Sequence, residues 1–352
     1  METSITLNPA GFGARLPLDE AAAFAVEAER LGIDTVWAQE AWGTDAFTPL
    51  AHLAALTTRV KLGTGIAQVT ARAPAMLAMS AMTLDDLSGG RMVLGLGVSG
   101  PQVVEGLHGQ RYARPIERLR ETIEILRLAL AGEQLVSNGR QVRLPLPGGE
   151  GKALRLAHDP HPDLPVHLAT LGPKAMELCG EVADGWISTC FVPERAAAAT
   201  DALTRGARRA GRDPSAVAID AGGPIAFTDD VEPLLAERKR ALAFQLSAMG
   251  SPTRNFYADA YRRMGFADEA DAVRHLWLAG RKGDAAAAVP DVLATATTMF
   301  GTPNMVRDRM RAYRDAGVTS LRLEPVAPDP ADRLETIAQA VDLAQEVSAE
   351  ET

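Results

Sequence analysis

The chain has 352 residues, of which 47% are hydrophobic, so we expect one large α/β domain that spans 1–352 and has a substantial core. Its formal net charge is −9, which argues against binding to nucleic acid or to an anionic membrane surface, because both need clustered Lys and Arg. No stretch approaches the ~18 apolar residues of a membrane span, so we do not expect the protein to cross a membrane.

Strands and helices alternate along the first third of the chain. Phe24, Ala28 and Leu31 follow helical spacing and Gly32 can end that helix, while Pro74 and a later proline at 115 can each begin one. The predicted strands are 4–8, 33–38, 60–65 and 92–97, and the predicted helices are 19–31, 48–57, 74–87 and 115–130.

The same alternation continues in the second half, with two interruptions. Residues 131–163 are rich in Gly and Pro and predict a hairpin-like excursion, whereas 250–302 is Ala-rich and predicts a helical one. The remaining predicted strands are 165–170, 184–190, 216–227 and 318–326, and the helices are 173–182, 194–210, one from about 231, 303–316 and 332–346.

Roughly eight strand–helix units predict a (β/α)8 TIM barrel with insertions. A faint internal repeat agrees, because ERLGIDTVW and RDAGVTSLR both run from a helix end through Gly into a strand. A doubly wound sheet is the alternative, but Gly11 and Gly13 do not complete GxGxxG after the first strand. GLGVSG at 95–100 has the right letters but follows the fourth strand.

The working face of such a barrel lies at the C-terminal ends of its strands. Glycines end the strand VKLGTG there, where Gly lets the backbone bend or a flat ligand approach; a plain strand-to-loop turn is the alternative. SGGR at 88–91 precedes a strand, so it belongs to the opposite face, where Asp85 and Arg91 are expected to pair.

Cysteine and histidine usage excludes two kinds of site. Cys179 and Cys190 form neither a CxxC pair nor a disulfide framework, so reduced thiols and a cytoplasmic location are expected. His158 and His161 lie in the loop HDPHPD, but a metal site there would need further ligands that the sequence does not identify. We therefore expect no metal site.

Four segments in order carry a resemblance to a known family. They are VWAQEAWGTDAFTPLAHLAALTTRVKLGTGI, TLDDLSGGRMVLGLGVSG, LGPKAMELCGEVADGW and GTPNMVRDRMRAYRDAGVTSLRL. The chain resembles the luciferase-like monooxygenase superfamily, and within it the coenzyme F420-dependent oxidoreductases of the methylenetetrahydromethanopterin reductase type. The resemblance covers nearly the whole chain, and it implies the same TIM barrel.

The resemblance implies how F420 is held. A non-prolyl cis peptide between Gly65 and Ile66 presses against the central ring of the deazaflavin, and Glu40 is the acidic partner of that ring. Further cofactor contacts come from Ser99 and Gly100, at its pyrimidine edge or ribityl chain, although an Asn of some relatives corresponds to Val104. The phosphate is implied at the helix start formed by Gly172, Pro173 and Lys174, where backbone N–H groups face outward.

The resemblance also narrows the reaction. Sugar-phosphate dehydrogenases of the family carry Asp-His where this chain has Glu40-Ala41, so the histidine base is missing. Reduction of a C=C or C=N bond by hydride transfer from reduced F420 is therefore favoured, with His108 or Tyr112 as candidate proton donors. The candidate substrate-pocket residues are Trp42, Gln68, Arg72, Asn255 and Tyr257.

Two other functions stay open. A two-component FMN-dependent monooxygenase would share the fold and the phosphate site, and a barrel without catalysis could act as a ligand-binding protein. The excursion 250–302 is expected to cover a small-molecule substrate or to form a partner contact, and a small helical core is an equal alternative. A homodimer is expected, and the loops do not reveal the substrate.

Overall fold

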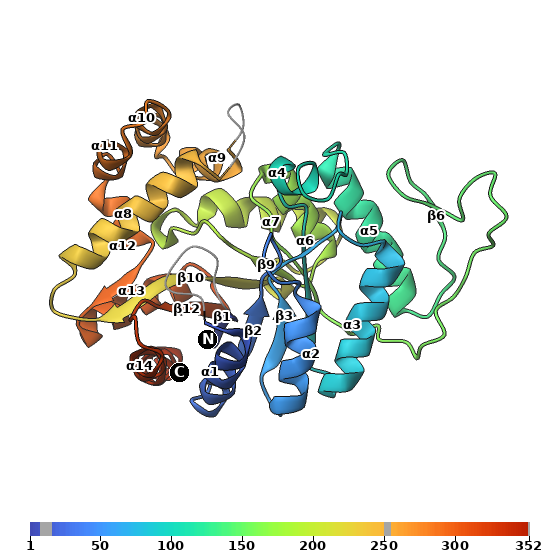
Figure 1. Ribbon diagram of the computed structural model, residues 1–352, viewed down its shortest axis with the longest axis horizontal. Helices are drawn as coiled ribbons and strands as arrows, with labels where there is room; N and C mark the ends of the chain where they lie inside the picture. Colours follow the sequence, from blue (N-terminus) through green and yellow to red (C-terminus); the bar gives the residue numbers. More distant parts are fainter. Residues whose placement is uncertain (8–15, 250–254, 351–352) are drawn as a thin grey trace.

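The computed structural model describes residues 1–7, 16–249 and 255–350, so Asn8, Gly11, Gly13 and the first five residues of 250–302 lie outside the described residues. Eight parallel strands close into a ring, which confirms the predicted (β/α)8 barrel (Figure 1). In ring order they are β1 (Glu2–Leu7), β2 (Thr35–Ala38), β3 (Lys61–Thr64), β5 (Met92–Gly97), β8 (Val166–Leu168), β9 (Gly185–Ile187), β10 (Ala218–Phe227) and β12 (Ser320–Pro325).

Helices surround the barrel and bury their apolar faces against it. Pro74 begins α3 and Pro115 begins α5, as the sequence predicts, and α6 also begins with a proline. Helix α3 ends at Gly89, whose φ of 70° suits glycine. The outer helices are α1 (Leu18–Arg30), α2 (Phe47–Leu56), α3 (Pro74–Ser88), α5 (Pro115–Leu130), α6 (Pro173–Val182), α7 (Ala197–Arg209), α8 (Glu232–Ser247), α13 (Pro303–Asp315) and α14 (Pro330–Ala349).

The two excursions have the predicted character. The first contains an antiparallel pair, β6 (Ser137–Asn138) with β7 (Arg143–Leu144), on a loop that stands away from α5 in Figure 1. The second holds α9 (Phe256–Arg263), α10 (Ala267–Leu278), α11 (Lys282–Ala287) and α12 (Asp291–Ala296), which pack with α8 around a core of their own. Of the alternatives for this excursion, a small helical core is therefore present. Its last residues form a short strand that the sequence did not predict, β11 (Met299–Gly301), paired with β10.

Short elements complete the working face. β4 (Ala67–Gln68) pairs with β5, and α4 (Pro101–Val104) follows β5 directly. Of the two turns of 3₁₀-helix that flank α7, Pro193–Arg195 follows β9 on this face, whereas Pro214–Ala216 precedes β10 on the opposite face.

No described helix combines the length and the apolarity that crossing a membrane requires, and Cys179 and Cys190 are free and buried.

The N-terminal face holds SGGR as predicted, with one correction. Gly89 and Gly90 both adopt positive φ, which tightens the turn into β5. Arg91 does not pair with Asp85; its guanidinium instead donates to the backbone carbonyls of Ala54 and Val60. These carbonyl groups lie near the end of α2 and just before β3, while the Asp85 carboxylate accepts from the Met92 N–H. The pair of Asp85 with Arg91 was therefore predicted wrongly.

Helices α6 and α7 cross closely because each carries a glycine at the contact. A Cβ on Gly180 would stand 2.0 Å from the Leu203 carbonyl oxygen, and a Cβ on Gly206 would stand 1.9 Å from that of Glu177. Both obstacles are backbone atoms, so a side chain cannot simply move aside. The two glycines therefore set the distance between these helices.

Gly206→Ala is expected to lower the free energy of unfolding by about 1–3 kcal/mol, because overpacking must push α6 and α7 apart. Urea unfolding monitored by circular dichroism would measure it. Gly283→Ala is the matched control: Gly283 also lies inside a helix, but a Cβ there meets no atom within 4 Å. Equal midpoints for the two variants would contradict the explanation.

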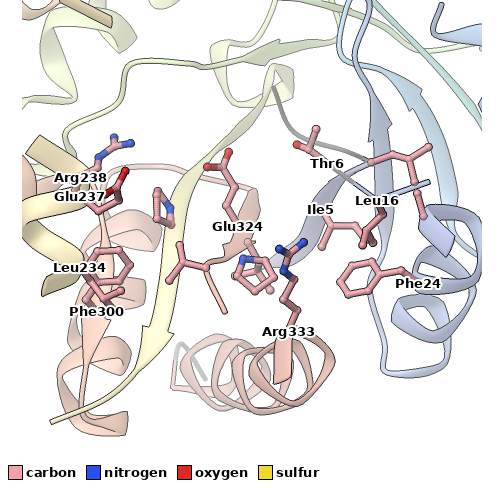
Figure 2. A pocket seen from close by; sticks show the side chains of 16 residues that line it. Ile5, Thr6, Leu16, Phe24, Leu234, Glu237, Arg238, Phe300, Glu324 and Arg333 are labelled. Carbon is pink, nitrogen blue, oxygen red and sulfur yellow. The ribbon is translucent and has the colours of Figure 1, made fainter. Parts of the chain in front are cut away.

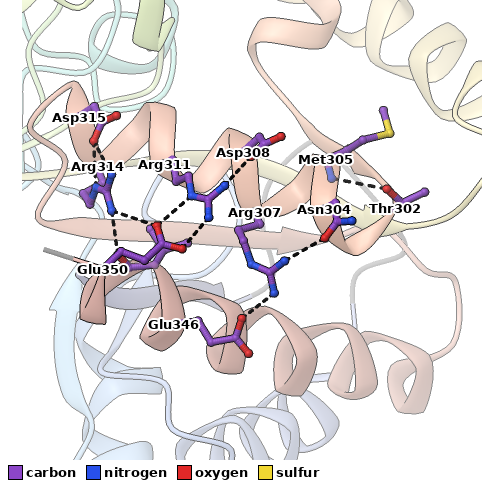
Figure 3. Close-up of polar contacts among 11 residues, drawn as sticks. Thr302, Asn304, Met305, Arg307, Asp308, Arg311, Arg314, Asp315, Glu346 and Glu350 are labelled. Carbon is purple, nitrogen blue, oxygen red and sulfur yellow. Dashed lines mark hydrogen bonds and ion pairs between the residues drawn. The ribbon is translucent and has the colours of Figure 1, made fainter.

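The C-terminal helix is fastened to α13 by a row of ion pairs (Figure 3). Arg307 pairs with Glu346 at 2.6 Å, and Arg311 pairs with Glu350 at 2.6 Å. The hydrogen bonds from Arg311 lower the pKa of Glu350, so this contact is strongest where the carboxylate is ionised. Arg314 joins the same carboxylate at 3.5 Å.

Candidate functional site

Three predicted site residues meet where β2 and β4 end. Arg72 contacts both carboxylate oxygens of Glu40, at 2.6 and 2.7 Å, and the backbone N–H of Gln68 donates to the same group at 3.2 Å. The Glu40 side chain is only 8% exposed. The buried Gln68 amide donates to the Glu40 and Ala41 carbonyl oxygens. Glu40, Gln68 and Arg72 therefore hold the loop that follows β2 against the segment that follows β3.

The Gly65–Ile66 peptide is cis, as the resemblance predicts. Packing against Trp37 also explains why positions 63 and 65 are glycines. A Cβ on Gly63 would stand 2.2 Å from the Trp37 ring, and one on Gly65 would stand 3.0 Å from the Cβ of Trp37. The room left by both glycines is thus filled by an indole inside the barrel, while the Ile66 side chain lies on Gly97 of β5.

The lumen of the barrel contains a buried polar network centred on Asp220. One of its carboxylate oxygens accepts from Ser4 at 2.6 Å, Ser320 at 2.8 Å and the Trp37 indole N–H at 3.1 Å, and the other faces Arg322 at 3.0 Å. Asp220 is 1% exposed. The register that pairs Asp220 with Ser320, and Ser4 with Arg322, brings these strands' inward side chains together.

A histidine lies beside this network. The ring of His167 on β8 lies 5.8 Å from that of Trp37 and is tilted by 44° to it. Burial lowers the pKa of His167 because a charged imidazolium is poorly solvated there. Ser188, which follows β9, accepts an Arg322 hydrogen bond at its carbonyl. The lumen therefore combines one buried ion pair with a neutral histidine directly beneath the strand ends.

Ser99, Gly100, His108 and Tyr112 lie on the segment after β5. Ser99 has a positive φ of 56°, and its carbonyl oxygen accepts a long hydrogen bond of 3.4 Å from the Tyr112 hydroxyl. The Tyr112 ring lies 6.5 Å from that of Phe256 on α9, so the second excursion reaches this segment. The buried Nε2 of His108 has no hydrogen-bond partner among the described residues.

The start of α6 lies at the end of β8 with Gly172 as its N-cap residue. A Cβ on Gly172 would meet no atom within 4 Å, and Lys174 is exposed. Arg263 of α9 donates to the Leu171 carbonyl oxygen at 2.6 Å, which places a second cation beside this helix start. Two cations and the first N–H groups of a helix form a surface suited to an anion.

The other predicted pocket residues differ in exposure, since Trp42 lies on the surface and Asn255 is buried. Trp42 is 66% exposed. Asn255 is buried and caps α9, since its side-chain oxygen accepts from the Tyr257 and Ala258 N–H groups while its amide donates to Gln245. Burial raises the pKa of Tyr257 to about 12, so its hydroxyl is protonated at neutral pH.

A cavity of about 350 Å³ opens between the ends of β1, β10 and β12. Figure 2 shows Glu324 and Arg333 between an α8 wall carrying Glu237 and Arg238 and an α1 wall carrying Phe24. Glu324 lies 3.6 Å from Arg322, so the cavity connects to the lumen network. Its lining contains none of the site residues that the sequence predicted.

The sequence prediction missed the lumen network and the cavity. The alternation of apolar and polar residues along β12 is the pattern that predicts them. Leu321 and Leu323 pack outward in the core, so the polar residues that alternate with them face the lumen. These are Ser320, Arg322 and Glu324. In the same way, an aspartate in the middle of the apolar run AIDAGG indicates a buried carboxylate that needs partners.

The chain is similar to known proteins over most of its length. The family model described as luciferase-like monooxygenase matches residues 3–320. A Mycobacterium tuberculosis protein named "Putative coenzyme F420-dependent oxidoreductase" is 43% identical over 88% of this chain and 91% of its own length. The 5,10-methylenetetrahydromethanopterin reductase of Methanolobus tindarius is 29% identical over 92% and 96%. The solved F420-dependent tetrahydromethanopterin reductase of Methanopyrus kandleri shares the fold, with a TM-score of 0.78, 23% identity, and coverage of 96% and 97%.

Proposed function

Because the chain belongs to the luciferase-like monooxygenase family, and shares 43% identity with a relative named for F420-dependent oxidoreduction, we propose that it is an F420-dependent oxidoreductase. We further propose that it works as a reductase, delivering a hydride to a small organic substrate. The observation that carries the proposal is the anion-binding geometry at the start of α6, on the face where β8 ends.

The residues at that helix fit a phosphate-bearing cofactor. A Cβ on Gly172 would meet no atom within 4 Å, so there is open space beside the helix start. Pro173 has no N–H group, so the first position of the helix leaves no donor without a partner. Lys174 and Arg263 supply positive charge beside it. In this proposal the cofactor phosphate lies against Gly172, Pro173 and Lys174.

The deazaflavin ring is assigned to the neighbouring strand ends. The Gly65–Ile66 backbone and the Ser99–Gly100 turn would hold its two sides, with Glu40 at its edge. When bound, F420 supplies a two-electron hydride donor at C5. Arg72 contacts both oxygens of the Glu40 carboxylate and holds it in place, so the protein contributes orientation and a shielded site.

The proton donor is proposed to be His108 or Tyr112. His108 offers a buried Nε2 without a partner among the described residues, and Tyr112 lies at the segment that α9 covers. Trp42, Gln68, Arg72, Asn255 and Tyr257 are proposed to shape the substrate side. Of these, Asn255 would act by fixing α9, because its side-chain groups already cap that helix.

Binding of the two candidate cofactors tests the proposal. The purified chain should quench F420 fluorescence on binding and leave FMN fluorescence nearly unchanged. The reverse pattern would support the two-component FMN monooxygenase, which shares this fold and phosphate site. Binding of neither would favour a barrel without catalysis. A homodimer and a cytoplasmic location belong to the same proposal, the latter fitting the two free, buried thiols.

Lys174→Ala is expected to weaken F420 binding about tenfold, which corresponds to the loss of one hydrogen bond to a charged group. Fluorescence titration measures the dissociation constant. Lys152→Ala is the matched control, because Lys152 is also exposed but lies in the excursion 131–163. Equal affinities for the two variants would remove Lys174 from the cofactor site.

A further inference from the structure

Two histidines and a carboxylate converge on the N-terminal face of the barrel, away from the working face. Asp86 lies near the end of α3, and His158 and His161 lie in the loop that leads to β8. The Nε2 atoms of His158 and His161 each stand 3.2 Å from a different oxygen of Asp86. The three ligand atoms lie within 4.8 Å of one another, which is the spacing that one shared ion requires.

The second ring nitrogen of each histidine is already occupied. Nδ1 of His161 lies 2.8 Å from the Asp85 carboxylate, and Nδ1 of His158 lies 3.0 Å from the Asp159 carbonyl oxygen. Asp85 is itself held by the Met92 N–H at 3.0 Å. Histidine ligands of metals typically use their other nitrogen in this way, which fixes the ring and directs Nε2 at the ion.

The loop that carries the histidines is held in place before any ion binds. The His161 N–H donates to the Leu130 carbonyl oxygen at 2.8 Å. Pro160 packs over Gly132, where an added Cβ would stand 2.8 Å from its ring. The side chains of His158 and His161 are only 22% and 15% exposed. Such a loop loses little freedom on binding a ligand, so more of the coordination energy is available as affinity.

We propose that His158, His161 and Asp86 bind one divalent transition-metal ion of the zinc type, with water completing the coordination. Two imidazoles and one carboxylate suit Zn²⁺ and its neighbours, whereas Mg²⁺ and Ca²⁺ prefer oxygen ligands. The site joins the excursion 131–163 to α3 and lies on the face of the barrel associated with stability, so its role is structural. The sequence alone could not name Asp86 as the third ligand, because only the fold brings α3 to this loop.

The test uses the full chain without a purification tag, stripped of metal with a chelator. Isothermal titration with Zn²⁺ should show saturable binding of one ion per chain, and Zn²⁺ should raise the midpoint of thermal unfolding. Mg²⁺ at the same concentrations should do neither. The absence of stoichiometric Zn²⁺ binding would overturn the proposal.

Variants locate the ion. Asp86→Asn and His158→Gln should each abolish the stoichiometric binding and the thermal shift, whereas Asp85→Asn should weaken Zn²⁺ affinity by about 10- to 100-fold through the loss of ring orientation. His275→Gln, an exposed histidine on α10, should bind like the unaltered chain. Two ligand variants are used so that the test can still be read if one of them fails to fold. Unchanged affinity in either folded variant would show that the ion lies elsewhere.

Discussion

Asp220→Ala is expected to lower the free energy of unfolding by about 3–5 kcal/mol. The change removes the counter-ion of Arg322, a guanidinium that is itself almost fully buried. It also removes the acceptor of Ser4, Ser320 and the Trp37 indole. The buried cation would keep the Ser188 carbonyl and Glu324, which lies 3.6 Å away. It would lose its nearest carboxylate, and three donors would lose their acceptor among buried side chains, so that each loss adds to the penalty.

Urea unfolding followed by tryptophan fluorescence would measure this loss. The control is Asp315→Ala, which removes a carboxylate that is 65% exposed and pairs with Arg314 on the surface. That variant should change stability by less than about 1 kcal/mol, because water screens and replaces such a pair. If Asp220→Ala lost no more stability than Asp315→Ala, the lumen network would not be an important stabilising feature.

Glu40→Gln is expected to reduce F420-dependent turnover by about 100-fold, if the proposed cofactor site is right. The amide keeps the shape of the side chain but cannot balance the charge of Arg72, which contacts both carboxylate oxygens. The loops after β2 and β3 would shift, and the negative charge at the ring edge would be lost. Steady-state rates with reduced F420, together with the F420 dissociation constant, would separate the effect on turnover from that on binding.

Glu181→Gln provides the control for that experiment. Glu181 also forms a two-point pair with an arginine, Arg120, at 2.6 and 2.7 Å, but it does so on the outside of the barrel between α5 and α6. Its replacement should leave turnover nearly unchanged. A similar fall in turnover for both variants would indicate a general loss of stability, and would remove Glu40 from the active site.

Most of the fold could be predicted from the sequence because strand and helix signals were local. Pro115 begins α5 and Gly89 ends α3 where their chemistry predicts. β11 could not be predicted, since three residues after a run of helices carry no periodicity and form a strand only because β10 extends beside them. Asp85 and Arg91 were predicted to pair on the N-terminal face, but in the fold the Arg91 guanidinium donates to the carbonyl groups of Ala54 and Val60 instead.

The site was predictable where its chemistry follows a strand directly, and not where it depends on distant partners. Glu40, Gln68 and Arg72 do come together, as residues at neighbouring strand ends must. Arg263 reaches the working face from α9, whose position no local pattern reveals. The meaning of Gly63 also depended on the fold, because its missing side chain makes room for Trp37.

That indole has a consequence for how the sequence can change over evolutionary time. Any side chain at Gly63 would overlap the Trp37 ring, and one at Gly65 would crowd its Cβ. A smaller residue at position 37 would create the space that a larger residue at 63 then needs. The three positions are therefore expected to covary among relatives, so that single replacements are eliminated and compensated pairs persist.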